Sequence, residues 1–195
     1  MTRVLGLLSI VLLLAVGAAP QTSRTVTFLP VPELGYRLVP DFFTYPSPVQ
    51  YGETSGVALN SKGHIFLFQR AHPMLAEFDE RGKFLRSIGD GLFDHPHGLR
   101  IDAEDNIWTT DDGNHVVLEL SPSGRVLLVL GRKDWGAEAD WLLNKPADVA
   151  FGKAGEIYVA DGYGNSRVVK FDPPVEIVDR LRKRTPNIMT AAETI

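Results

Sequence analysis

A repeated spacing constrains the fold of this chain more than any other feature of its sequence. Apolar residues and glycines of one segment recur 42 positions later, and part of the set recurs after a further 50 or 51. A period in the low forties with alternating apolar residues is typical of one four-stranded blade of a β-propeller. The repeated positions are Val57, Ile65, Phe78, Gly82 and Gly89, then Leu99, Ile107, Leu120, Gly124 and Gly131, then Val149, Ile157 and Phe171.

The spacing predicts an all-β fold with about three four-stranded blades within residues 51–173, which is too few to close a ring. Alternating apolar residues separated by turn residues predict the individual strands. In the first blade we expect strands at residues 55–59, 64–68, 74–78 and 83–88. An insertion of eight residues lies between the second and third blades, within "RKDWGAEADWLLNK". Insertions of this kind are loops, and loops carry function more often than strands do.

The segments outside the blades have different compositions. Residues 1–19 have the pattern of a signal peptide: Arg3, an apolar run over residues 4–16 and small residues before Pro20. This pattern predicts export to the periplasm or the extracellular space, with no membrane association after cleavage; an uncleaved anchor is the alternative. Residues 20–50 are expected to form an extension with one strand at Tyr36–Val39. Residues 174–195 are expected to form an irregular or short helical tail.

Charge and cysteine content exclude some classes of partner and of stabilisation. The 195 residues carry a net charge of −4, with acidic and basic residues interspersed. Because no basic stripe is present, we expect no nucleic-acid partner. The chain has no cysteine, so the protein must be stabilised without disulfide bonds.

Several segments of the blades carry a family resemblance. The stretches "IYVADGYGNSRVVKFDP" and "HPHGLRIDAEDNIWTTD" look like NHL repeats. Together with "SGVALNSKGHIFLFQR" and "NKPADVAF", they resemble the peptidyl-α-hydroxyglycine α-amidating lyase family over about residues 34–173. The resemblance implies a six-bladed NHL-type propeller with a zinc ion held by three histidines. It also implies cleavage of a peptide hydroxyglycine to a peptide amide and glyoxylate.

His97 is the candidate zinc ligand. The position that opens each inner strand is Ser55 in the first blade, His97 in the second and Ala147 in the third. Only the second blade places a metal ligand there, and inner strands line the axis of a propeller. The resemblance implies that His97 binds zinc and that two further histidines come from later blades. The alternatives are a histidine that caps a turn, and a two-histidine site with His95.

Arg70 and Tyr163 are the candidate catalytic residues. The repeat equivalents of Arg70 are Asp112 and Gly162, so the blade does not require an arginine there. A guanidinium can bind a substrate carboxylate through two hydrogen bonds. The resemblance implies a catalytic role for Arg70 and a role as general base for Tyr163. The alternatives are a surface ion pair for Arg70 and a packing role for Tyr163.

The resemblance also implies a calcium site at the backbone carbonyls of Val57 and Leu99. Carbonyl oxygens suit calcium because it is a hard cation. The remaining carboxylate ligand of the family falls beyond this chain.

Two functional interpretations remain open at this point. The first is a zinc-dependent lyase-like protein of the type that acts on a peptide with a C-terminal hydroxyglycine, present here as an N-terminal half that is truncated, frame-shifted or completed by another chain. Because two of the three zinc histidines would come from later blades, an inactive isolated chain is one form of this interpretation. The second is a non-catalytic NHL-repeat module that binds peptides or proteins. Open blade edges also invite self-association, because unpaired strands can pair with a second copy.

Overall fold

The structure is a computed structural model that describes residues 35–47, 49 and 51–172. The expected signal peptide and C-terminal tail lie outside the described residues. The chain divides into two compact units, Met1–Leu38 and Val39–Ile195, and all strands of the described residues belong to the second. Among the residues that the structure describes, no helix is long and apolar enough to cross a membrane.

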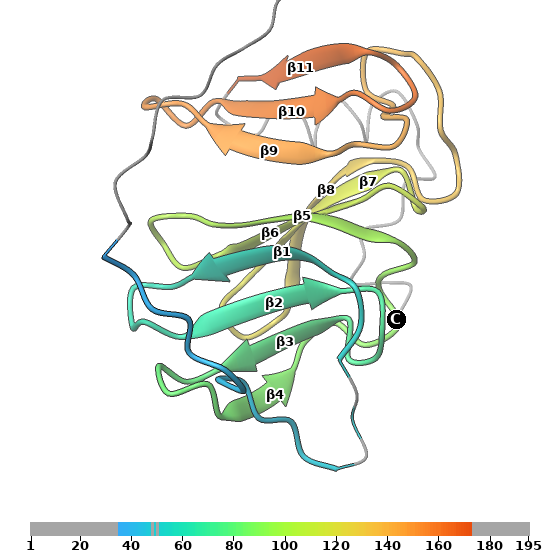
Figure 1. Ribbon diagram of the computed structural model, residues 1–195. Helices are drawn as coiled ribbons and strands as arrows, with labels where there is room; N and C mark the ends of the chain where they lie inside the picture. The colour runs from blue at the N-terminus through green and yellow to red at the C-terminus, as the bar shows by residue number, and fades with distance from the viewer. Residues whose placement is uncertain (1–34, 48, 50, 173–195) are drawn as a thin grey trace, which may run out of the picture. The chain divides into compact units, whose positions relative to one another are not determined.

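The described strands form three antiparallel sheets in which each strand pairs with the next one along the chain (Figure 1). The all-β, propeller-type fold predicted from the repeat is therefore confirmed. Within the described residues the third sheet has three strands rather than four. The bounds are β1 Thr54–Leu59, β2 Ile65–Gln69, β3 Leu75–Phe78 and β4 Phe84–Ser87; β5 Pro96–Ile101, β6 Ile107–Asp111, β7 Val116–Leu120 and β8 Val126–Gly131; β9 Asp148–Phe151, β10 Ile157–Asp161 and β11 Arg167–Phe171.

The expected strand at Tyr36–Val39 is not formed, since these residues have no strand conformation. Instead, Thr44 makes a short parallel bridge to Lys83 at the edge of the first sheet. Alternation of apolar and polar residues is not enough to form a strand when no neighbouring strand offers its backbone groups. The prediction failed because it rested on alternation alone.

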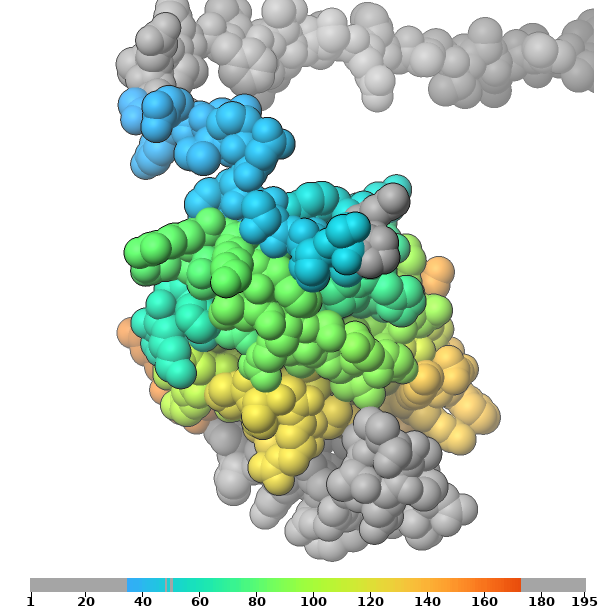
Figure 2. Space-filling view, turned by 90° about the horizontal axis from the view of Figure 1, so that it is seen from below, coloured from blue at the N-terminus to red at the C-terminus, as the bar shows by residue number. Residues whose placement is uncertain are grey.

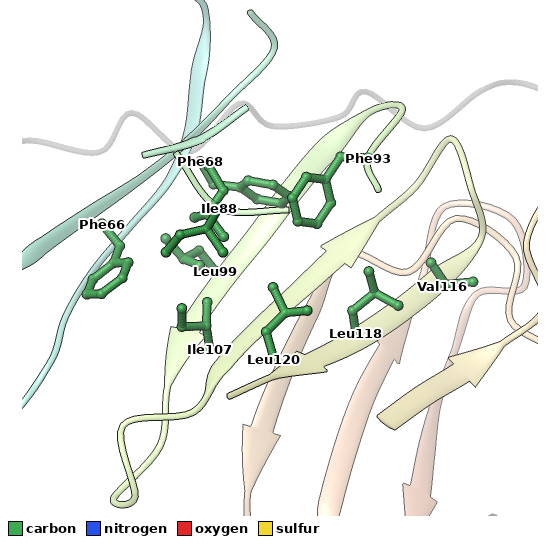
Figure 3. Close-up of a cluster of buried hydrophobic side chains, with 10 residues drawn as sticks. Phe66, Phe68, Ile88, Phe93, Leu99, Ile107, Val116, Leu118 and Leu120 are labelled. Carbon is green, nitrogen blue, oxygen red and sulfur yellow. The ribbon is translucent and has the colours of Figure 1, made fainter. Parts of the chain in front are cut away.

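Apolar side chains fill the space between the first and second sheets. Phe66 and Phe68 of β2 pack with Leu99, Ile107 and other residues of the second sheet (Figure 3). Successive residues of a strand point to opposite faces, so the second sheet contributes to two cores. Ile107 faces the first sheet, whereas its neighbour Trp108 belongs to the core shared with the third sheet.

The remaining faces of the outer sheets differ in how well they are covered. Phe43 and Tyr45 pack against Phe78 on the first sheet, each with ring centroids about 5 Å from that of Phe78. Figure 2 shows this segment, in blue, against the green residues of the first sheet. Val57 on β1 and Val168 on β11 are exposed. Self-association through such open edges and faces stays a prediction.

Glycines allow the inner strands of neighbouring sheets to approach closely. Figure 1 shows β5 between β1 and β9. A Cβ atom added to Gly56 of β1 would lie 2.7 Å from the Cβ of Leu99, and one added to Gly98 of β5 would lie 2.6 Å from the carbonyl oxygen of Ala147. Gly56 and Gly98 are 42 residues apart and so occupy equivalent positions of the repeat. The repeat therefore includes the requirement for a small residue where blades meet at their inner strands.

Candidate active site

One end of the blades collects the three residues singled out from the sequence. Because the strands are antiparallel, the starts of β1, β5 and β9 lie at the same end as the ends of β2, β6 and β10. Arg70 follows β2, His97 is the second residue of β5, and Tyr163 lies in the loop after β10. These positions are far apart in the sequence and come together through the stacking of the blades.

His97 is held between the third sheet and Tyr163. Its Nδ1 atom lies 2.7 Å from the carbonyl oxygen of Ala147, and its Nε2 atom lies 3.0 Å from the hydroxyl oxygen of Tyr163. A carbonyl oxygen only accepts hydrogen bonds, so Nδ1 carries the proton of the neutral ring. Nε2 then presents its electron pair and accepts a hydrogen bond from the Tyr163 hydroxyl. The two rings meet edge to face, with centroids 5.1 Å apart.

Hydrogen bonds hold the loop that carries Tyr163 in place, although the tyrosine itself is 64% exposed. Buried Asp161 accepts hydrogen bonds from Asn165 at 2.7 Å and from the Nε atom of Arg167 at 2.9 Å. Arg167 also donates to two backbone carbonyls of the insertion between the second and third blades. This bracing involves Asp161, Asn165 and Arg167 together. It fixes the backbone on both sides of the tyrosine.

Arg70 contacts the residue that precedes His97. Its Nε atom donates to the carbonyl oxygen of Pro96 at 3.3 Å, and its NH1 atom lies 3.3 Å from a carboxylate oxygen of Glu53. An exposed ion pair of this kind contributes about 0–1 kcal/mol to stability. The NH2 atom has no hydrogen-bond partner among the described residues. The guanidinium is therefore tied to the backbone of the residue before His97, and it also makes the ion pair that was the alternative interpretation.

His95 does not join His97 in a two-histidine site. Its Nδ1 atom makes a short contact with the carboxylate of Asp112, which occupies the repeat position equivalent to Arg70. His97 turns instead to Ala147 and Tyr163. Sequence reasoning missed the carbonyl of Ala147, because a backbone acceptor leaves no trace in residue type.

The residues present fit one ligand of a zinc site. The Nε2 electron pair of His97 faces the Tyr163 hydroxyl, a position in which a metal ion would replace that hydroxyl, and the hydrogen bond from Nδ1 to a carbonyl is the usual outer partner of a ligating histidine. The described residues contain no group of three or more histidine, cysteine or carboxylate side chains placed to hold a metal ion. Within the described residues His97 is thus a single candidate ligand, and zinc binding stays a prediction.

The calcium expectation fits less well. The carbonyl oxygen of Leu99 accepts a hydrogen bond of 3.1 Å from the NH1 atom of Arg100. Arg100 also pairs through NH2 with the carboxylate of Asp148 on β9. A cation from the chain itself thus already occupies this carbonyl, and Val57 shows no such partner. Calcium at Val57 and Leu99 stays a prediction, and it would require Arg100 to move.

Comparison with known proteins agrees with the repeat. Residues 143–171 match the NHL repeat family. Over 160 residues the chain is 32% identical to a probable peptidyl-alpha-hydroxyglycine alpha-amidating lyase of Caenorhabditis elegans, which covers 70% of this chain and 46% of that protein. It is 35% identical over 150 residues to the peptidyl-glycine alpha-amidating monooxygenase of Mus musculus, with 63% of this chain and 15% of that protein covered.

A crystal structure supports the fold alone. A protein of unknown function from Bacteroides thetaiotaomicron superposes with a TM-score of 0.51 at 18% identity, and the match covers 66% of this chain and 34% of that one. The repeat, the meandering sheets and the family match together define an NHL-repeat β-propeller protein. In sequence the chain is similar to the peptidyl-α-hydroxyglycine α-amidating lyase family. It spans less than half the length of the curated relatives named above.

Proposed function

We propose that the end of the blades where Arg70, His97 and Tyr163 lie is part of a zinc-dependent lyase site. The substrate is a peptide with a C-terminal α-hydroxyglycine, and the products are the peptide amide and glyoxylate. The observation that carries the proposal is the 3.0 Å contact between His97 and Tyr163, which lie 66 residues apart in the sequence. Similarity to relatives named as lyases supports it, because one such match extends over 70% of this chain.

His97 contributes its Nε2 electron pair to the metal. When bound there, zinc acts as a Lewis acid on the oxygen atoms of the substrate. The same electron pair accepts the Tyr163 hydroxyl in the structure, so the metal and the phenol are alternative partners of Nε2. The hydrogen bond from Nδ1 to Ala147 holds the ring in the tautomer that keeps this electron pair available.

Tyr163 moves the proton. In its ionised form it accepts the proton of the substrate hydroxyl as the carbon–nitrogen bond breaks. The electron pair of the O–H bond forms the carbonyl of glyoxylate, and the electron pair of the C–N bond leaves with the amide nitrogen, which takes up a proton. The bracing of its loop through Asp161 keeps the backbone of Tyr163 in place during this exchange.

Arg70 binds the carboxylate of the hydroxyglycine. Its NH2 atom, which has no hydrogen-bond partner among the described residues, suits a planar carboxylate. The hydrogen bond to Pro96 ties the guanidinium to the backbone next to His97. A substrate held by Arg70 therefore lies beside the imidazole.

We also propose that residues 1–19 direct export of the protein. Export would bring the enzyme into the same compartment as secreted peptides, which are its proposed substrates.

Glyoxylate release from a hydroxyglycine peptide tests the assignment. With zinc supplied, Tyr163→Phe should lower the rate by at least about 100-fold, the size of a typical general-base contribution. Arg70→Ala should raise KM for this substrate more than it lowers kcat. Tyr158→Phe is the matched control, because Tyr158 lies on β10 of the same sheet and makes no contact with His97. A folded chain that neither releases glyoxylate nor binds the peptide in an Arg70-dependent way would refute the proposal and leave the binding-module interpretation.

A further inference from the structure

Thr110 makes two hydrogen bonds that converge on His97. It lies on β6 and is fully buried. Its Oγ1 atom accepts the backbone N–H of Gly98 at 2.7 Å and donates to the carbonyl oxygen of Ala147 at 3.0 Å. Gly98 is the residue after His97, and the Ala147 carbonyl is the acceptor of His97 Nδ1. One hydroxyl thus connects the backbone of β5 to the carbonyl that orients the histidine.

The repeat does not require a hydroxyl at this position. The residues equivalent to Thr110 are Phe68 in the first blade and Ala160 in the third. Of these three positions, only that of the second blade carries a hydroxyl, and that blade also carries the histidine at the start of its inner strand. Thr110 and His97 thus both differ from the residues at the equivalent positions of the other two blades, and both lie in the second blade. This coincidence indicates that the two residues act together.

The neighbouring residue shows what a threonine without such a role looks like. Thr109 is also fully buried on β6, but its side chain points to the opposite face. Its hydroxyl has no hydrogen-bond partner among the described residues. Burying an unpaired hydroxyl costs free energy, so valine is an equal or better fit at position 109. At position 110 the same substitution leaves a buried N–H without its acceptor.

We propose that Thr110 is the positioning residue of the site: it holds the Ala147 carbonyl and the start of β5 so that His97 keeps its proton on Nδ1 and its electron pair on Nε2. The purpose assigned to His97 rests on the proposed function, but the hydrogen-bond arrangement does not. Gly98 belongs to the same device, because a side chain there would collide with both Thr110 Oγ1 and the Ala147 carbonyl. The device works through His97 and does not touch the substrate.

Histidine-ring ¹⁵N NMR of the full chain, at a pH where the ring is neutral, tests the proposal. Wild type and Thr109→Val should show His97 with its proton on Nδ1. Thr110→Val should show both tautomers and at least about tenfold faster hydrogen exchange at the Gly98 amide, and Thr110→Ser should restore both readouts. Thr110→Ala replaces the valine variant if the latter does not fold.

Two results would overturn the proposal. The first is a wild-type His97 with its proton on Nε2, which needs no variant at all. The second is a folded Thr110→Val or Thr110→Ala chain with an unchanged tautomer and an unchanged Gly98 exchange rate. These readouts need neither zinc nor turnover, so a failed lyase assay would refute the proposed function and leave the role of Thr110 standing.

Discussion

Replacing Gly98 by alanine perturbs the contact between β5 and β9 at its tightest point. The added Cβ would lie 2.6 Å from the Ala147 carbonyl oxygen and 2.7 Å from Thr110 Oγ1. Neither atom is the end of a flexible chain, so β9 must move away from β5 by about half an ångström. Overpacking of this kind costs about 1–3 kcal/mol. The reduced freedom of the unfolded chain offsets about 0.4–1 kcal/mol of that.

The same movement lengthens the hydrogen bond between His97 Nδ1 and the Ala147 carbonyl, which is now 2.7 Å. Loss of this bond adds about 1 kcal/mol. The expected net destabilisation is about 1–3.6 kcal/mol. For a chain of this size, that corresponds to a melting temperature lower by about 2–14 °C.

Urea unfolding and thermal unfolding of Gly98→Ala measure this loss directly. Gly162→Ala is the control, because a Cβ at Gly162 would meet open space. The control should be as stable as wild type or slightly more stable. A Gly98→Ala protein as stable as the control, with the His97–Tyr163 contact intact, would refute the account of how the second and third blades meet.

Three further predictions concern other parts of the molecule. Hydrogen bonds from Ser61 hold the pKa of Asp105 below its usual value of 3.8. The ionised carboxylate therefore stabilises the fold above pH 3.8, and this stabilisation is lost as the pH falls below that value. The melting temperature of Asp105→Asn should depend less on pH over this acid range than that of wild type. Millimolar calcium should leave the melting temperature of wild type unchanged and raise that of Arg100→Ser, in which Asp148 loses its partner. An equal response of both proteins would contradict the claim that Arg100 occupies the Leu99 carbonyl in place of calcium. Leu120→Ala, in the core between the first two sheets, should lower the free energy of unfolding by about 2–5 kcal/mol, and a loss below 1 kcal/mol in urea unfolding would contradict that packing.

Much of the fold could be predicted from the sequence, because blades are built from local patterns. Strand β2 begins and ends within one residue of its expected position, and turns fall where glycine and asparagine predict them. The strand expected at Tyr36–Val39 failed for the opposite reason, since pairing depends on a partner that alternation does not reveal. The same contrast holds within the second blade, where the bulge between Pro96 and Leu99 interrupts a register that the repeat alone does not show.

The site could be predicted only in part. Arg70, His97 and Tyr163 stood out because they depart from the repeat and match the family segments. Their mutual arrangement depends on how the blades stack, which no local pattern encodes. Thr110 also departs from the repeat, but its residue type does not indicate which groups it contacts. The carbonyl of Ala147 is a backbone group and has no signal in the sequence.

The central claim is that His97 of the second blade is a working part of a lyase site. Glyoxylate release from a hydroxyglycine peptide, measured together with bound zinc on the purified chain and on His97→Ala, tests it most directly. With zinc supplied in excess, we expect wild type to release glyoxylate and peptide amide in equal amounts, and His97→Ala to lose this zinc-dependent turnover while remaining folded. Equal zinc binding and equal turnover by the two proteins would contradict the claim.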